Sequence, residues 1–186
     1  MNITVYCGAS VGNNPAYADA ARLIGNWIAN NNHKLVYGGG KAGLMGIVAD
    51  EVLKHNGEVI GIIPTFLVER ELSHPNLTQL EIVDSMSQRK NRMIELGECY
   101  VALPGGPGTL EEISEVISWA RIGQHKNPCI LFNVNGYYNK LKELFDDMAD
   151  NGFLSEADKS MMLFTDSLQE LEQFIENFKP VAVRTY

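Results

Sequence analysis

The feature that most restricts the fold of this chain is the alternation of short apolar runs with longer amphipathic ones. The short runs are apolar almost throughout, which is typical of strands buried on both faces of a parallel sheet. The longer runs place apolar residues three and four positions apart, which predicts helices. Such alternation with short connections predicts an α/β fold, a Rossmann-like doubly wound parallel sheet, in a single domain over residues 1–186.

The predicted elements lead directly to the places where function is expected. The predicted strands cover residues 3–7, 34–37, 58–63, 79–83, 99–103 and 128–132. The predicted helices cover residues 15–31, 43–55, 86–96, 110–122, 137–151 and 168–178. In sheets of this class, ligands bind beyond the carboxyl ends of the strands. The segments of interest are therefore residues 8–10, 38–40, 104–109 and the polar stretch after the fourth strand.

Composition and charge narrow the classes of partner. The net charge is −8, so general attraction to nucleic acid is not expected, and an anion must be bound by a local cluster of positive groups. No apolar run approaches the roughly 20 residues of a membrane helix, and the N-terminus has no signal-peptide pattern. Cys7, Cys99 and Cys129 each lie in or beside a strand-like run without CxxC spacing, which predicts buried free thiols in a reducing cytoplasm.

A first glycine-rich turn follows the second predicted strand. Gly38, Gly39, Gly40 and Gly43 match the GxGxxG pattern of dinucleotide-binding turns. The match is weak, because the next strand ends without the carboxylate, about 20 residues on, that would hold an adenosine ribose. Two other interpretations remain open. The glycines let a helix pack close to the sheet, or the turn, with Lys41, lies against the sugar or phosphate of a ligand.

A second glycine-rich turn, residues 104–109, joins a buried strand to a helix. Gly105, Gly106 and Gly108 expose backbone amides there, and Thr109 adds a hydroxyl. The free N–H groups and the dipole of a helix N-terminus favour an anion. The turn lacks the Lys-Ser/Thr pair of a Walker A loop, so it predicts a phosphate site of another kind.

Two carboxylates follow this turn. Thr109 and Glu112 have the spacing of a capping box, in which the Glu112 side chain would bond back to the Thr109 amide. The alternative is that an acid beside a bound phosphate serves the substrate. Since Glu111 and Glu112 project about 100° apart on a helix, we expect only one of them to enter the cleft.

A basic cluster stands out in this acidic chain. Arg89, Lys90 and Arg92 lie on a helix that opens at the same sheet edge as the glycine turns. A solvated, cation-bearing helix is one interpretation, and binding of phosphate or carboxylate by arginine is the other. The four histidines are scattered without metal-ligand spacing, so no metal site is expected.

Together these motifs resemble one known family. The residues are Gly38–Gly40 with 43–46, then Arg89 and Lys90, then PGGxGTxxE at 104–112. They are similar to the LONELY GUY family of cytokinin riboside 5′-monophosphate phosphoribohydrolases, some of whose bacterial members are labelled lysine decarboxylases. The similarity extends to residues 118–120 and 132–138. Lys41, Pro107 and Ser118 depart mildly from the family pattern.

The resemblance implies a cofactor-free homodimer that hydrolyses the N-glycosidic bond of a nucleoside 5′-monophosphate, such as AMP or N6-prenylated AMP. It implies that Arg89 and Glu112 are catalytic. The substrate contacts that it implies are Glu71, Lys90, Gly106, Pro107, Gly108, Thr109, Leu110, Glu111 and Ser118. The position of the turns adds Ser10, Gly39, Gly40 and Gly105 as predicted contacts. The identity of the base and the biological role stay open.

Two other functions remain as alternatives. A non-catalytic nucleotide carrier or sensor would keep the glycine turns without requiring both Arg89 and Glu112. A lysine decarboxylase would need a pyridoxal phosphate site, for which Lys41 and Lys90 are the only suggestion in these motifs.

Overall fold

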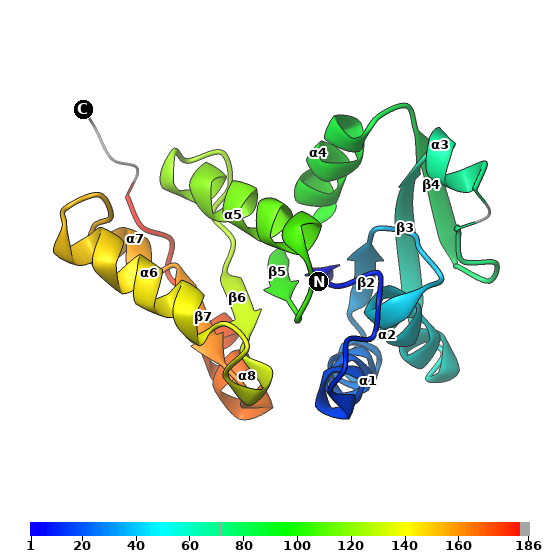
Figure 1. The fold of residues 1–186 in the computed structure, drawn as a ribbon, viewed down its shortest axis with the longest axis horizontal. Helices are drawn as coiled ribbons and strands as arrows, with labels where there is room; N and C mark the ends of the chain where they lie inside the picture. The colour runs from blue at the N-terminus through cyan, green and yellow to red at the C-terminus, as the bar shows by residue number, and fades with distance from the viewer. Residues whose placement is uncertain (71, 183–186) are drawn as a thin grey trace.

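A computed structural model describes residues 1–70 and 72–182. Within them, seven parallel strands form one sheet in the order β4-β3-β2-β1-β5-β6-β7 (Figure 1). The strands are β1 (Asn2–Tyr6), β2 (Lys34–Tyr37), β3 (Glu58–Pro64), β4 (Gln79–Val83), β5 (Cys99–Ala102), β6 (Cys129–Phe132) and β7 (Met162–Thr165). The predicted α/β fold with a parallel sheet is confirmed.

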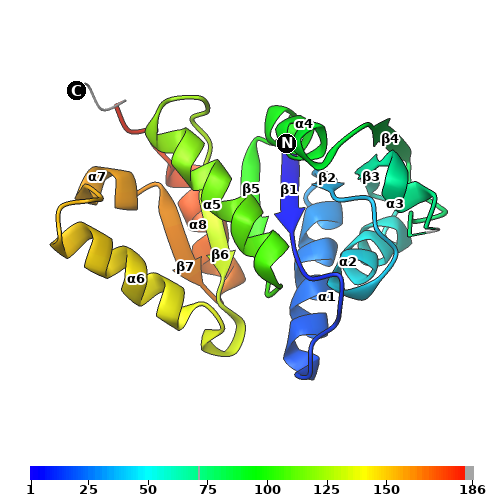
Figure 2. The same cartoon turned by 45° about the horizontal axis from the view of Figure 1, so that its top comes forward.

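Helices cover both faces of this sheet. The helical segments are α1 (Pro15–Asn30), α2 (Gly43–Lys54), α3 (Thr65–Val68), α4 (Met86–Leu96), α5 (Pro107–Arg121), the 3-10 turn η1 (Val134–Gly136), α6 (Asn139–Asp150), α7 (Glu156–Lys159) and α8 (Leu168–Asn177). Helices α1, α2 and α8 pack on one face, and α4, α5 and α6 pack on the other (Figures 1 and 2). None of the helices within the described residues combines the length and apolarity needed to cross a membrane.

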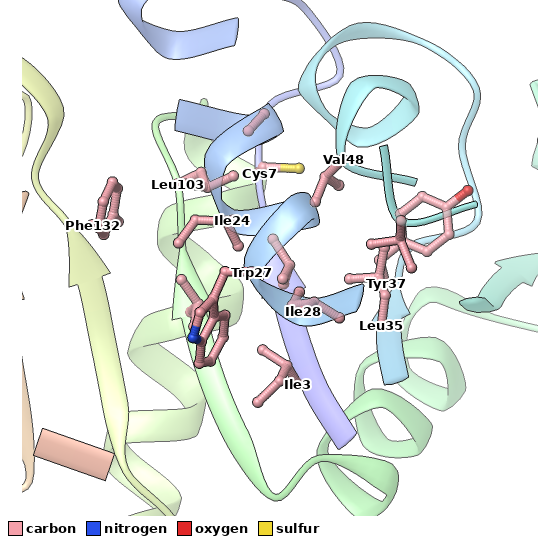
Figure 3. Packing of buried hydrophobic residues seen from close by; sticks show 14 of the residues in the cluster. Ile3, Cys7, Ile24, Trp27, Ile28, Leu35, Tyr37, Val48, Leu103 and Phe132 are labelled. Carbon is pink, nitrogen blue, oxygen red and sulfur yellow. The ribbon is translucent and has the colours of Figure 1, made fainter. Parts of the chain in front are cut away.

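The core follows from the period of two along each strand. Ile3 and Val5 of β1 face the α1 and α2 layer, while Tyr6 faces the α4 and α5 layer. Figure 3 shows Ile24 and Ile28 of α1 beside the strand residues of the first layer. Cys7, Cys99 and Cys129 are all buried free thiols within these layers. Burial on both faces explains why the strands read as continuous apolar runs.

One helix start and one strand differ clearly from the prediction. Helix α5 begins at Pro107, not at residue 110, because proline fits the first helical position, where its missing N–H needs no partner. Strand β7 was not predicted. It is a four-residue edge strand in which Leu163 and Phe164 are only partly buried, and a short apolar run such as residues 161–164 does not by itself distinguish a strand from a helix.

The order of the strands fixes where a ligand can enter. From β1 at the centre, the chain adds β2, β3 and β4 in turn on one side of the sheet, and then β5, β6 and β7 in turn on the other side. The order in which strands are added therefore switches sides between β1 and β5, which are parallel neighbours and lie side by side in Figure 2. A reversal of this kind leaves a crevice beyond the carboxyl ends of the two strands.

Candidate active site

The segments that follow β1 and β5 are joined by backbone hydrogen bonds. The Leu103 N–H donates to the Tyr6 carbonyl at 2.9 Å, and the Gly8 N–H donates to the Pro104 carbonyl at 3.1 Å. A cavity of about 230 Å³, which we call the central cavity, opens at this point. Its lining includes Tyr6, Cys7, Gly8, Ala9, Met45, Met86, Arg89, Gly106, Gly108, Thr109, Glu111 and Glu112.

The second glycine turn forms one wall of the central cavity. A side chain at Gly105 would collide with the Thr109 hydroxyl, since its Cβ would lie 2.2 Å from Oγ1. At Gly106 and Gly108, in contrast, no atom of the described residues other than the chain neighbours and the backbone of α5 itself lies within 4 Å of such a Cβ. Gly106 is the N-cap of α5 and makes no side-chain cap. The amides of the first helical turn therefore border open space, where an anion is favoured.

Glu112 lies one turn into α5 and points inward. Because α5 begins at Pro107, Thr109 is already inside the helix and cannot act as its N-cap. The capping-box interpretation of Glu112 is therefore wrong. The residue is only 9% exposed, and its Oε1 lies 3.9 Å from Nη1 of Arg89. Burial raises the pKa of Glu112 to about 7, although the positive charge of Arg89 opposes this shift.

Arg89 is buried on α4 and is held in place by two strand ends. Its Nε donates to the Ile62 carbonyl of β3 at 3.1 Å, and its Nη2 donates to the Gly38 carbonyl, just after β2, at 3.0 Å. The guanidinium lies where a side chain at position 38 would be, because a Cβ on Gly38 would lie 1.6 Å from Nη2. The solvated-helix interpretation therefore fails for Arg89.

The other two cations of the cluster point elsewhere. The Lys90 ammonium lies 2.8 Å from Glu111 and 3.0 Å from Glu115, and these acids raise its pKa, Glu111 most strongly. Arg92 pairs with Glu81 at 2.8 Å. Lys90 is not part of the central cavity lining, so its predicted contact with a phosphate stays a prediction. Of the two adjacent acids, Glu112 is buried and Glu111 is exposed.

The first glycine turn is filled by protein. Gly38, Gly39 and Gly40 are all buried, and a Cβ on Gly43 would lie 2.3 Å from the backbone of Ala9. Gly39 and Gly40 are not among the residues that line the central cavity. The packing interpretation accounts for this turn, and the geometry gives no support to substrate contacts by Gly39 and Gly40.

The remaining predicted contacts lie around the central cavity rather than in it. Ser10 lines a neighbouring cavity of about 200 Å³, and Pro107 and Leu110 line another of about 520 Å³. Gly105 and Gly106 border both of them. Ser118 is exposed farther along α5. Glu71, also a predicted contact, lies outside the described residues.

Sequence reasoning missed several residues of the site. Tyr6 and Cys7 line the central cavity from the end of β1, and Met45 and Met86 line it from α2 and α4. Their positions near the carboxyl ends of strands could have indicated that they lie at the site, but none of them belongs to a recognisable chemical motif. Among the described residues, no three side chains of histidine, cysteine, aspartate or glutamate are grouped to hold a metal ion.

The arrangement has the elements of a nucleotide-cleaving site. It combines a helix N-terminus that borders open space, a buried carboxylate whose pKa is raised to about 7, and an immobilised arginine. A carboxylate with a raised pKa in a cleft suits proton transfer or stabilisation of a developing positive charge.

Comparison with solved structures supports the fold. The molybdenum cofactor binding protein from the phototrophic bacterium Rippkaea orientalis matches with a TM-score of 0.72 at 20% identity, over 94% of each chain. The Moco carrier protein from Chlamydomonas reinhardtii matches with a TM-score of 0.71 at 18% identity, over 95% of this chain and 96% of that one. At these identities the likeness concerns the fold alone.

Comparison of sequences gives the family. The family model described as "Possible lysine decarboxylase" matches residues 45–175. The chain is 41% identical over 178 residues to cytokinin riboside 5′-monophosphate phosphoribohydrolase LOG1 of Arabidopsis thaliana, covering 96% of this chain and 84% of that one. It is 42% identical over 163 residues to the cytokinin riboside 5′-monophosphate phosphoribohydrolase of Rhodococcoides fascians, covering 87% and 82%. These matches confirm the resemblance seen in the motifs, and the chain belongs to the LOG family of cytokinin riboside 5′-monophosphate phosphoribohydrolases.

Proposed function

We propose that this protein hydrolyses the N-glycosidic bond of a purine nucleoside 5′-monophosphate, releasing the free base and ribose 5-phosphate. The observation that carries the proposal is the position of Glu112, which is buried 3.9 Å from Arg89 and one helical turn beyond an open anion-binding turn. The relatives that are about 40% identical are named for this reaction. AMP and N6-prenylated AMP are the candidate substrates.

The phosphate of the substrate binds at the second glycine turn. The amides of Gly106, Gly108 and Thr109 surround the N-terminus of α5, where the helix dipole favours a negative charge. This anchor lies away from the bond that breaks. Binding energy at such a remote group holds the anomeric carbon beside the catalytic side chains and so lowers the barrier.

Glu112 and Arg89 then act on the two sides of the glycosidic bond. When the C1′–N bond breaks, its electron pair leaves with the base, and positive charge develops on the sugar ring. The ionised carboxylate of Glu112 stabilises this charge and accepts a proton from the water whose oxygen attacks C1′. Arg89 holds the substrate and assists the departure of the base, which takes up a proton from solvent, while Glu112 releases the proton that it accepted from the water to solvent.

We also propose that the protein is a cytoplasmic homodimer. The buried free thiols fit a reducing compartment. The edge strand β4 exposes Leu80 and Ile82, and Phe66 and Met86 on the flanking helices are also exposed. An unpaired edge beside apolar side chains is typical of an interface. Light scattering should give twice the chain mass of 20.6 kDa, and the mass of a monomer would contradict the proposal.

A nucleotide carrier without catalysis is the alternative. Two of the fold neighbours are named as cofactor-binding or carrier proteins, but at about 20% identity they support only a shared fold. A carrier needs the open turn but has no use for a buried acid beside a buried arginine. The pair of Arg89 and Glu112 therefore favours the enzyme.

The test is incubation with AMP, N6-prenylated AMP and the corresponding nucleosides, with chromatography of free base and ribose 5-phosphate. We expect both products to appear in equal amounts from the monophosphates. The nucleosides should be poor substrates, because they lack the group that binds the second glycine turn. Equal turnover of adenosine and AMP would contradict the role of the turn, and binding without any cleavage would favour the carrier.

A further inference from the structure

Two consecutive tyrosines reach the second glycine turn from a distant part of the chain. Tyr137 and Tyr138 lie between η1 and α6. The Tyr137 hydroxyl donates to the Gly105 carbonyl, and the Tyr138 hydroxyl donates to the Leu103 carbonyl at 2.7 Å. With the bond from Gly8 to the Pro104 carbonyl, three successive carbonyls ahead of α5 are each held by a donor.

The turn that carries the tyrosines is itself well fixed. The Asn133 side chain accepts from the Tyr138 N–H at 2.6 Å, and its amide group donates to Asn139 at 2.8 Å. The ring of Tyr137 packs edge-on against Tyr17 with centroids 5.6 Å apart. The hydroxyl of Tyr137 is therefore delivered to the Gly105 carbonyl by a rigid support.

The bond from Tyr137 controls a specific peptide plane. A trans peptide is planar, so a fixed Gly105 carbonyl also fixes the Gly106 N–H, which points the opposite way. This peptide lies between two glycines, where the backbone has the least resistance to reorientation. Among the described residues, the Gly106 N–H donates to no protein acceptor. Gly106 lines the central cavity, so its N–H is available to a ligand there.

We propose that Tyr137 is a positioning residue, whose hydroxyl holds the Gly105–Gly106 peptide so that the Gly106 N–H faces the phosphate of the substrate. The inference rests on the proposed function, since it assumes that a phosphate binds at this turn. It assigns Tyr137 no contact with the reacting atoms. Its effect is to preorganise a donor that would otherwise have to be oriented at the moment of binding.

Tyr138 supplies a matched control. Its hydroxyl holds the Leu103 carbonyl, and the nitrogen of that peptide belongs to Pro104, which has no N–H. Loss of this bond can therefore misdirect no donor for phosphate. Tyr138 is also only 5% exposed, whereas Tyr137 is 42% exposed. Loss of the Tyr138 hydroxyl should therefore mainly lower the stability of the fold, and loss of the Tyr137 hydroxyl should mainly weaken phosphate binding.

The experiment compares Tyr137→Phe, Tyr138→Phe and the parent protein. Titration calorimetry with ribose 5-phosphate should show roughly fivefold to tenfold weaker binding for Tyr137→Phe, the equivalent of one lost hydrogen bond. KM for AMP should rise in Tyr137→Phe more than kcat falls, and turnover of adenosine should not change. Tyr138→Phe should melt at a lower temperature but bind ribose 5-phosphate as tightly as the parent.

The outcomes separate this inference from the proposed function. Weaker binding in Tyr137→Phe without hydrolysis of AMP by any of the three proteins would refute the function and leave the inference. Equal affinity of Tyr137→Phe and the parent, with AMP hydrolysed, would refute the inference and leave the function. Absence of ribose 5-phosphate binding by the parent would overturn the inference, because no phosphate would then meet the Gly106 N–H.

Discussion

The two glycine turns of this protein look alike in sequence but serve opposite purposes. Both follow a strand of the parallel sheet and both lead into a helix. In the first, the space beside Gly38 is taken by the guanidinium of Arg89, and Gly43 lies against the backbone of Ala9. In the second, Gly106 and Gly108 border space that no described residue fills. One turn makes room for the protein and the other makes room for a ligand.

The difference shows that the first turn affects the candidate site indirectly, through the position of Arg89. Gly38 contributes to the candidate site only because its missing side chain admits Arg89 between the ends of β2 and β3. The second turn presents its own amides. A glycine cluster after a strand therefore identifies a place where atoms come close, but it does not say whether those atoms belong to a substrate or to the chain.

The largest effect on activity is expected at Glu112, the buried acid that follows the second glycine turn. Glu112→Gln should lower kcat for AMP roughly 100- to 1,000-fold, because a neutral amide cannot stabilise positive charge on the sugar. Release of adenine measures the loss. Glu111→Gln, at an exposed neighbouring acid, should keep most of the activity. A folded and fully active Glu112→Gln would show that the open turn serves binding alone.

The next largest effect is expected in the first glycine turn, at Gly38. Gly38→Ala should destabilise the protein by about 1–3 kcal/mol, because the new methyl group overpacks the space of the Arg89 guanidinium. Activity should fall together with stability as Arg89 moves away from Glu112. Thermal melting and AMP turnover measure the two effects. Unchanged turnover in Gly38→Ala would break the proposed link between the first turn and the catalytic pair.

A smaller effect concerns pH. Burial raises the pKa of Glu112 to about 7, so the carboxylate is increasingly protonated below that pH. Because the proposed mechanism requires the ionised form, kcat/KM should fall about tenfold per pH unit below 7 and level off above it. Glu111 lies near Glu112 and also raises its pKa, so in Glu111→Gln the fall should begin at a lower pH. A profile identical to that of the parent would argue against Glu112 as the titrating group.

The smallest effect is expected at Gly108, where replacement of the glycine should stabilise the fold and not destabilise it. Gly108 is the second residue of α5, and a methyl group there meets no described atom. Gly108→Ala should therefore stabilise the fold by about 0.5–1 kcal/mol, as alanine does in helices. It should also weaken binding of ribose 5-phosphate, because the methyl group narrows the space at the turn. Melting and calorimetry on one preparation measure both, and a destabilised variant would contradict the open geometry.

Most of the fold follows from the sequence because the central strands are buried on both faces. The first six strands and the six long helices are visible as apolar runs and helical spacing. Strand β7 was missed although residues 161–164 form an apolar run, because so short a run does not by itself distinguish a strand from a turn of helix. The start of α5 was misplaced because the prediction began the helix after the glycines and ignored the preference of proline for a first turn.

The candidate site was less predictable than the fold, because the residues that meet there are far apart in the sequence. The motifs indicated Arg89 and Glu112, but no local pattern shows that Arg89 crosses to Gly38, which lies 51 residues away. The capping-box interpretation depended on the wrong helix start. The contribution of Tyr137 could not be seen either, because a tyrosine 32 residues from Gly105 has no periodic relation to it.

In the proposed mechanism, the anchoring of Arg89 makes catalysis depend on completion of the whole sheet. Its two carbonyl partners belong to the N-terminal half, and the acid opposite it belongs to the C-terminal half. A chain severed between α4 and β5 would leave each piece with one member of the pair. Turnover would return only if the pieces reassociated along β1 and β5, so enzymatic activity itself reports how well the two halves are docked.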